Sequence, residues 1–432
     1  MTTLNICIAG LGNVGSQLIK SIEENNSYFE NKFDIKINII GISAINKNKK
    51  RIINIQKYHW FDDPKKMLSL KECNVFVELI GTEKGVSYEL IELALKKNIH
   101  VVTGNKALIA TYGDELFKLA EQNSLALSYE AAVAGGIPII KTIKNDISFN
   151  KIKKISGILN GTTNYILSKM DEENLTFDKV LEIAKEKGFT SDHESKLDIG
   201  GFDAAHKLTI LSTIGFGSVI NFENNFIEGI SKVKIEDINF SRKLGYKIKL
   251  ISEAEIIDNQ IFNITSPKLI NIKNPLANVD NALNAINIET DHLENLFLEG
   301  QGAGGKPTAS SVLSDLFEIA HNSSFNNLRF KTSSLKNYKK YSYDNIKSRY
   351  YLRIMTEDKP GVLSSITNLF SKTGISVEKI LQLPEKIHTD LPIPIIITTH
   401  SIQKVILTNV ISQLEKLNFV KESITVLPIH DN

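Results

Sequence analysis

The chain has 432 residues, of which 42% are hydrophobic and 23% are charged, and its formal net charge at pH 7 is +2. This length suits about three domains, each with its own hydrophobic core. The small net charge gives no reason to expect nucleic acid or a membrane as a partner, and no apolar run is long enough to span a bilayer. Only two cysteines occur, and an apolar run begins almost at the first residue. We therefore expect a cytoplasmic protein without a leader peptide or disulfides.

The first third of the chain alternates short apolar runs with helical patterns. The apolar runs are LNICIA, INIIGIS, NVFVELIG, HVVTG and LALSYEA. Strands separated by helices indicate crossover connections and therefore a parallel sheet.

A glycine motif follows the first apolar run and precedes a helical pattern. It consists of Gly10, Leu11, Gly12, Asn13, Val14 and Gly15. In this position the first glycine permits a tight turn, the second lets the backbone approach a pyrophosphate, and the third packs helix on strand. The anion would lie at the helix N-terminus. We expect these six residues to bind a dinucleotide, within a Rossmann domain over residues 1–130.

The end of the second apolar run indicates which dinucleotide binds. NAD sites usually place an acid there for the ribose 2′-hydroxyl, and the stretch IIGISAINKNKKR has none. Instead, Lys47, Lys49, Lys50 and Arg51 could pair with a 2′-phosphate. We therefore predict NADP, with NAD as the alternative.

Between about residues 130 and 300 the segments become longer. KIKLISEAEI and IFNITSPKLI are typical of antiparallel strands, and VLEIAKEKG and DAAHKLTILSTIGF of helices. We expect an α+β catalytic and dimerisation domain over residues 131–320. Its last helix, near 308–320, is expected to return to the Rossmann domain.

The stretch GFTSDHESKLDIGGFDAAHK, residues 188–207, gathers carboxylates, histidines and lysines among small residues. A solvated face is the simpler explanation of such a charge run. The glycine and alanine pairs favour a tight site that a small ligand can approach. Both explanations stay open on this stretch alone.

Six motifs together make the chain resemble homoserine dehydrogenases over essentially its whole length. They are the glycine motif, HVVTGNKALIA, YEAAVAGGIPII, GILNGTTNYIL, the stretch at 188–207 and EGQGAGGKPTASSV. The resemblance implies interconversion of L-aspartate 4-semialdehyde and L-homoserine with NAD(P)H. This reaction is a step in the biosynthesis of threonine, methionine and isoleucine.

The residues agree with what this reaction needs. Hydride transfer to an aldehyde carbon builds negative charge on its oxygen, so a proton donor or a positive charge is required. Lys106 and Lys207 can supply either. Asp203 lies four residues before Lys207 and shares its helix face, where it could also meet the substrate's amino group. The substrate carboxylate could be met by Lys106 and by the backbone amides of residues 160–163, at an expected helix N-terminus.

The resemblance also assigns roles. It makes Lys207 the proton donor, gives Lys106 contacts to cofactor and substrate, and makes Asp203 a substrate ligand that Asp198 supports. It places along the cofactor three further residues, namely Thr82, Gly188 and Gly304.

A sodium site is implied for some members of the family. Here it would involve Glu130 and the backbone carbonyls of Val133, Gly135 and Ile137. A strand end followed by a glycine turn explains this segment equally well, because carbonyl sites leave no side-chain signal.

The segment between Gly188 and Asp198 departs from the family pattern, Glu-x-Asp-Pro. It reads Ser191, Asp192, His193, Glu194 and Ser195, with one extra residue and no proline. Counting from either end puts the family glutamate at Asp192 or Ser191, whereas chemistry favours Glu194, so the substrate-binding acid stays open. Two other functions also stay open: a nucleotide-binding amino-acid sensor without turnover, and a dehydrogenase of a related amino acid.

The end of the chain has a different organisation. Residues 321–347 are polar and weakly periodic, and we predict a linker. Residues 348–432 follow the order strand, helix, strand, strand, helix, strand. We expect Asp358 to cap the first helix, Pro360 to lie in its first turn and Gly374 to end it.

This order, together with the sequence D-K-P-G, resembles a ferredoxin-like ACT domain. The resemblance implies an amino-acid effector, with threonine expected, and a homodimer or homotetramer. A passive dimerisation module is the alternative.

Overall fold

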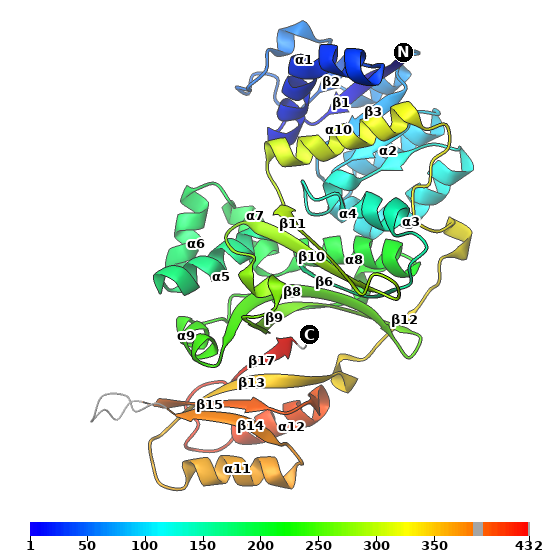
Figure 1. Cartoon of the computed structure of the whole chain (residues 1–432). Helices are drawn as coiled ribbons and strands as arrows, with labels where there is room; N and C mark the ends of the chain where they lie inside the picture. Colours follow the sequence, from blue (N-terminus) through cyan, green and yellow to red (C-terminus); the bar gives the residue numbers. More distant parts are fainter. Residues whose placement is uncertain (383–391, 431–432) are drawn as a thin grey trace.

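The computed structural model describes residues 1–382 and 392–430, except for the side chains of residues 192–194. Figure 1 shows a parallel sheet with its helices at one end, a long antiparallel sheet in the middle, and the C-terminal strands and helices at the other end. Within these ranges no helix is both long and apolar enough to cross a membrane.

The N-terminal sheet has five parallel strands, as predicted. In spatial order the strands are β2 (Ile35–Ser43), β1 (Thr2–Ala9), β3 (Val75–Glu78), β4 (His100–Thr103) and β5 (Leu127–Ser128). The helices of this region are α1 (Asn13–Phe33), α2 (Val86–Lys96) and α3 (Lys106–Gln122), with the short turns η1 (Ile55–Lys57), η2 (Pro64–Ser69) and η3 (Glu130–Ala132).

Both faces of this sheet are covered, which explains its apolar strands. Ile6 and Ile8 of β1 belong to the cluster on one face, while Cys7 belongs to the core on the other face. Helix α10 (Gly305–His321), far along the chain, lies against α1 (Figure 1). The rings of Phe29 and Phe317 meet edge to face at 5.0 Å.

The middle sheet is antiparallel and carries helices that approach the N-terminal sheet. In spatial order its strands are β11 (Asn295–Gln301), β10 (Leu283–Thr290), β6 (Ile152–Ile158), β8 (Tyr246–Ile257) and β9 (Gln260–Asn271), and β7 (Asn225–Ile227) pairs with β9. The helices are α4 (Ile139–Lys141), α5 (Gly161–Glu173), α6 (Phe177–Glu186), α7 (Asp192–Ile199), α8 (Phe202–Phe216) and α9 (Ile235–Lys243), with the turns η4 (Thr142–Asp146), η5 (Phe222–Asn224) and η6 (Pro275–Asn278).

The predicted antiparallel pair is the long hairpin of β8 and β9. Its turn residues, Asp258 and Asn259, both have positive φ, the backbone geometry that suits a two-residue hairpin turn. Helix α8 is apolar on most sides and packs its residues Leu208, Leu211 and Ile214 into the core. The two helices predicted in this region are confirmed as α6 and α8.

The C-terminal region has the predicted order of strands and helices. It contains β13 (Lys347–Thr356), α11 (Val362–Lys372), β14 (Val377–Gln382), β15 (Ile393–Thr399), the two-residue strand β16 (Ile402–Gln403), α12 (Lys404–Leu414) and β17 (Thr425–His430). Val362, Ile366 and Phe370 are buried along one side of α11, and Gly374, with a φ of 75°, follows its end as predicted.

The predicted start of α11 is wrong. The helix begins at Val362, and its N-cap is Gly361, which has a φ of 92° and no side-chain capping bond. Asp358 and Pro360 therefore lie before the helix, so Asp358 does not cap it. The reason is that the positive φ of Gly361 turns the chain sharply between the loop and the helix.

The C-terminal strands and the middle sheet form one continuous sheet. The last strand, β17, pairs with β13 and also with β9, at Ile429 with Leu269 and at His430 with Ile270. Figure 1 shows β17 between β9 and β13. The buried Asp237 of α9 accepts hydrogen bonds from Arg353 Nε at 2.7 Å and from the Tyr351 hydroxyl at 3.1 Å, both on β13.

The polar segment 321–347 contacts both the N-terminal region and the middle sheet. It contains the turns η7 (Thr332–Ser334) and η8 (Tyr343–Asn345) and the strand β12 (Lys339–Lys340), which pairs with β9. The buried Asn327 side chain accepts from the backbone N–H of Leu127 at 2.7 Å and donates to the carbonyl of Leu125 at 2.9 Å. Asn327 of this segment therefore pairs with the backbone of the N-terminal region.

Candidate active site

The glycine motif has open space where a dinucleotide would approach. Gly10 has a φ of 101°, and a Cβ there would lie 2.3 Å from the carbonyl of Leu79. A Cβ at Gly15 would lie 2.0 Å from the Gly10 oxygen, whereas Gly12 has no atom within 4 Å of the same position. Helix α1 has no side-chain capping bond, so its first N–H groups point to this space and suit an anion.

A buried glutamate shapes the loop beside this motif. Glu78, at the end of β3, accepts hydrogen bonds from the backbone of Ile80 and Gly81 at 2.9 and 3.1 Å. Its other oxygen accepts from the Thr103 hydroxyl at 2.6 Å. These bonds fix the loop that leads to Thr82 at the carboxyl edge of the sheet, where open α/β sheets bind ligands.

Lys106 is held at the start of α3. The preceding Asn105 accepts from the N–H of Leu108 at 3.2 Å and donates to the carbonyl of Thr82 at 2.7 Å. It thus caps the helix and ties it to the loop at Thr82. The Lys106 ammonium lies 3.0 Å from Asp203 Oδ1, so a residue of the N-terminal sheet reaches helix α8.

Asp203 and Lys207 form the predicted pair on one face of α8. Lys207 Nζ lies 2.8 Å from Asp203 Oδ2 and donates to the carbonyl of Leu159 at 2.7 Å. Both residues are buried. Burial alone would raise the pKa of Asp203, but Lys207 and Lys106 hold it well below its usual range. The carboxylate therefore stays ionised between two ammonium groups.

Asn160 connects this pair to Asp198. Its Nδ2 donates to Asp203 Oδ2 at 2.9 Å and to Asp198 Oδ1 at 2.7 Å, and its Oδ1 caps α5 by accepting from the N–H of Thr163 at 2.8 Å. The Thr190 hydroxyl donates to the other oxygen of Asp198. Burial, followed by the charge of Asp203, raises the pKa of Asp198.

The irregular segment leads into this cluster. Gly188 follows α6, and the Thr162 hydroxyl donates to the carbonyl of Phe189 at 3.2 Å. The predicted substrate-binding acids, Asp192 and Glu194, are in the first turn of α7, and their side chains lie outside the described residues. His206, one residue before Lys207, stacks its ring on Phe222 at 4.3 Å.

The loop containing Gly304 lies beside the glycine motif. A Cβ on Gly305 would lie 2.7 Å from Asn13 Oδ1 of the glycine motif. The N–H of Gly136 donates to the carbonyl of Gln301 at 2.9 Å. The segments YEAAVAGG and EGQGAGG therefore meet beside the motif.

Several of the expected sodium ligands make hydrogen bonds within the chain. The Glu130 carboxylate accepts from the N–H groups of Ile140 and Lys141, both at 2.8 Å. Burial, then the charge of Asp315, raises its pKa to about 7. The carbonyls of Gly135 and Ile137 already accept one hydrogen bond each. We derive no catalytic step through sodium.

Arg51 binds the backbone at the end of β2. Its Nε donates to the carbonyl of Leu11 at 3.1 Å, and its other nitrogens donate to the carbonyls of Asn46, Lys47 and Lys49. Arg51 therefore holds the loop of residues 46–49 against the glycine motif. Lys47 and Lys49 are exposed beside it.

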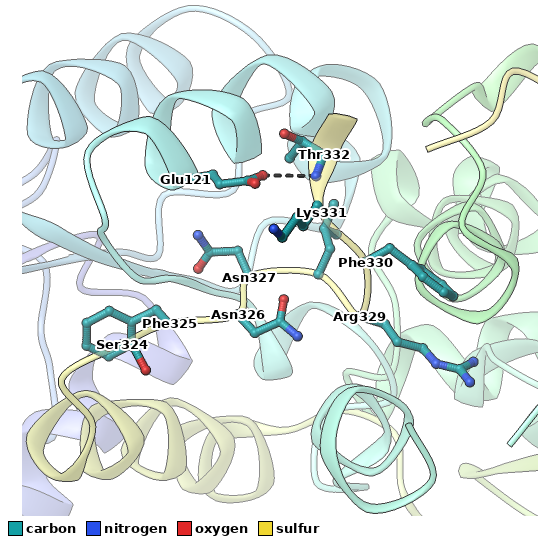
Figure 2. A pocket seen from close by; sticks show the side chains of 10 residues that line it. Glu121, Ser324, Phe325, Asn326, Asn327, Arg329, Phe330, Lys331 and Thr332 are labelled. Carbon is teal, nitrogen blue, oxygen red and sulfur yellow. Dashed lines mark hydrogen bonds between the residues drawn. The ribbon is translucent and has the colours of Figure 1, made fainter. Parts of the chain in front are cut away.

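A cavity of about 410 Å³ lies away from all these residues. It is bounded by Glu121 of α3 and by residues 324–332. Figure 2 shows the hydrogen bond between Glu121 and the backbone N–H of Thr332. The cavity does not include the lysines or carboxylates of the cluster, so its size is no guide to the chemistry.

Three family profiles match the chain. They are homoserine dehydrogenase at residues 138–317, its NAD-binding domain at 10–130, and the ACT domain at 350–419. The homoserine dehydrogenase of Neisseria gonorrhoeae is 35% identical over the whole of both chains. That of Bacillus subtilis is also 35% identical, over 98% of this chain and 97% of its own. The chain belongs to the homoserine dehydrogenase family.

Solved homoserine dehydrogenases share the fold. The structure from Thiobacillus denitrificans has a TM-score of 0.91 and 32% identity over 100% of this chain and 99% of its own. A hyperthermophilic archaeal homoserine dehydrogenase in complex with NADPH has a TM-score of 0.63 and 28% identity. It covers 76% of this chain and 99% of its own. The predicted combination of Rossmann, catalytic and ACT parts is confirmed.

Sequence reasoning missed several residues whose hydrogen bonds position the candidate site of this homoserine dehydrogenase. They are Glu78, Asn105, Thr190 and the side chain of Asn160. The sequence offered one signal for Glu78, namely an acidic residue at the end of an apolar strand. For Asn105 and Asn160 the only signal was that asparagine is a common N-cap residue of helices.

The two roles of Asn160 can be separated by substitution. Asn160→Ser keeps an oxygen that can cap α5 but cannot donate to both carboxylates, whereas Asn160→Ala loses both functions. We expect both variants to lower kcat/KM by about tenfold or more, since a hydrogen bond to a charged group is lost. Only the alanine variant should also lose about 1 kcal/mol of stability.

Steady-state kinetics and thermal unfolding of the two variants provide the measurements. Full activity in Asn160→Ser would show that the contacts to Asp198 and Asp203 have no role in the reaction.

Proposed function

We propose that the enzyme reduces L-aspartate 4-semialdehyde to L-homoserine, and catalyses the reverse oxidation, at the cluster around Asp203. The observation that supports this most is one buried carboxylate within 2.8 and 3.0 Å of two lysine ammonium groups. NADPH, when bound at the glycine motif, supplies the hydride. The cluster then has to bind an amino acid and stabilise an alkoxide.

Lys207 is the proposed proton donor. Its ammonium group has three N–H bonds, of which two are directed to Asp203 and Leu159. The third can reach the aldehyde oxygen, donate its proton as hydride arrives at the carbon, and regain one from solvent. Lys106 faces the same carboxylate from the cofactor side and would bind the substrate carboxylate.

The substrate's ammonium group would lie on the acidic side of the cluster. Asp203 and Asp198 are proposed to bind it, with Asp192 or Glu194 completing the set. Asn160 orients both of the first two carboxylates.

Substitution of Lys207 tests this assignment. Lys207→Ala should lower turnover by about 10² or more, the usual size of a general-acid contribution. Lys207→Met, which fills the same space, should do the same. NADPH binding, followed by fluorescence, should survive in both variants because Lys207 lies outside the glycine motif.

Wild-type turnover in either variant would remove Lys207 from the mechanism. NADPH oxidation by the unaltered enzyme with L-aspartate 4-semialdehyde is the reference assay. No turnover there would favour the amino-acid sensor instead.

We also propose a preference for NADP over NAD. No acid follows β2, and Lys47 and Lys49 are exposed where a 2′-phosphate would lie. Arg51 has another role, because it holds Leu11 of the glycine motif.

The different roles of Arg51 and of the two lysines predict different changes in the kinetics with NADPH and NADH. The double variant Lys47→Ala/Lys49→Ala should weaken NADPH and leave NADH nearly unchanged, which shrinks the ratio of the two kcat/KM values. Arg51→Ala should weaken both cofactors, since it releases the loop. An unchanged ratio in the double variant would show that these lysines do not contact the cofactor.

Regulation by threonine is proposed from the ACT domain. Threonine carries amino, carboxylate and hydroxyl groups for the loop at 358–363, and an effector must bind two states of the enzyme unequally.

The proposed domain boundaries are 1–130, 131–320, 321–347 and 348–432, with pairing of ACT domains in a homodimer or homotetramer. The family profiles support these ranges. Free Cys7 and Cys73 support a cytoplasmic location.

We predict that threonine inhibits the intact enzyme and that Asp358→Asn raises its inhibition constant about tenfold, corresponding to a coupling within the usual range. Asp344→Asn, in the adjoining segment 321–347 and outside the loop, is the control. Truncation after residue 320 should also abolish inhibition while keeping activity, but it uncovers Asp237 and Glu253, so the point variant is the cleaner test.

Equal threonine sensitivity in Asp358→Asn and in the truncated enzyme would place the effector in the active site. The C-terminal module would then be a dimerisation device.

A further inference from the structure

An asparagine on strand β10 has a buried side chain without hydrogen bonds. Asn284 is 0% exposed, and neither its Nδ2 nor its Oδ1 makes a hydrogen bond to any part of the chain that the structure describes. Buried polar groups are nearly always paired, because each one left unpaired costs stability. Two such groups in one side chain require a physical explanation.

The Asn284 amide lies against the loop that joins β11 to α10. A Cβ on Gly302 of this loop would lie 2.0 Å from Cγ, 2.2 Å from Nδ2 and 2.3 Å from Oδ1 of Asn284, so only glycine leaves room for the amide. Gly302 is also buried, and its own N–H and carbonyl make no hydrogen bond within residues 1–382 and 392–430. An unpaired side-chain amide therefore adjoins unpaired backbone groups that match it in donor and acceptor.

This pair of residues lies between the glycine motif and the lysine of the candidate site. The loop continues through Gly305, where a Cβ would lie 2.7 Å from Asn13 of the motif. In the other direction, Ala285 of β10 pairs with Ile158, the last residue of β6. The carbonyl of the next residue along accepts the hydrogen bond of Lys207. Strand β10 therefore connects the loop to the surroundings of the reacting group.

Two further residues of the loop can contact a dinucleotide directly. Ala303 and Gly304 follow Gly302 and are exposed, next to the residue that approaches Asn13. A cofactor that binds one arrangement of this loop more tightly than another shifts the loop toward that arrangement. Asn284 itself cannot touch the cofactor, because its amide has no exposed surface. Its partners have to come from the chain.

We propose that Asn284 positions the loop of residues 301–304 for the dinucleotide. In the arrangement that the bound cofactor favours, the amide accepts from the N–H of Gly302 and donates to its carbonyl. Asn284 therefore contributes to cofactor affinity, whereas its unpaired amide contributes nothing to the stability of the other arrangement. The proposal rests on cofactor binding at the glycine motif and is independent of the substrate and of the C-terminal module.

Thermal unfolding and NADPH binding of Asn284→Val test this role. Valine suits a buried strand position and has no polar side-chain atom. Without NADPH, the variant should unfold at the temperature of the unaltered enzyme or above it, because it loses no hydrogen bond and no longer buries an unpaired amide. The Kd for NADPH, followed by fluorescence, should rise about tenfold, the size expected from two lost hydrogen bonds.

Asn284→Ala separates the loss of the amide from any steric effect of valine. It should weaken NADPH binding to the same extent. If only the valine variant unfolds at a lower temperature, the cause is steric and the alanine variant decides the test.

Asn287→Val is the matched control on the same strand. The Asn287 side chain donates to Asn295 at 3.3 Å, at the end of β11 that lies away from the loop. Its Kd for NADPH should equal that of the unaltered enzyme. An equal rise in this variant would assign the effect to strand β10 as a whole and overturn the proposal.

Two other results would overturn it as well. One is an unchanged Kd in both Asn284 variants. The other is a lower unfolding temperature of both without NADPH, which would show that the amide is already paired and has only a structural role. The proposed reaction is judged separately. If NADPH binds to the unaltered enzyme but is not oxidised with L-aspartate 4-semialdehyde, the proposed function fails while the role of Asn284 stands.

Discussion

The buried carboxylate of Asp203 is the interaction on which the site depends. Burying an ion is costly, and two ammonium groups together with Asn160 offset that cost. Lys106 comes from the helix after β4 of the nucleotide-binding sheet, whereas Lys207 comes from α8 over the catalytic sheet. One carboxylate therefore pairs with both lysines and also joins the N-terminal sheet region to the catalytic sheet region. Removing it would leave two cations without their shared partner.

Much of this arrangement could be predicted where the signal is local. The glycine motif is contiguous, and Asp203 and Lys207 are one helical turn apart, so spacing alone places them together. Contacts between distant segments give no such signal. Asn160 meets Asp203 across 43 positions of the sequence, and Arg51 meets Leu11 across 40. A lysine-rich loop predicted a phosphate contact for Arg51, yet backbone carbonyls accept its hydrogen bonds.

The C-terminal module is part of the same sheet as the catalytic strands. Local periodicity predicted its six elements, but it could not show that β17 would pair with β9 or that Arg353 would cover Asp237. These contacts arise because the last strand has two free edges to satisfy. The module therefore contacts β9 through the pairing of β17, and β8 through the pair of His430 and Glu253.

The central claim is that Asp203 acts through Lys207, and a double-mutant cycle on kcat/KM tests it most directly. Asp203→Asn, Lys207→Met and the double variant are compared with the unaltered enzyme, using L-aspartate 4-semialdehyde and NADPH. If the two residues act as a unit, the double variant will be about as slow as the slower single variant. If the two effects multiply instead, Asp203 and Lys207 act independently and the account is contradicted.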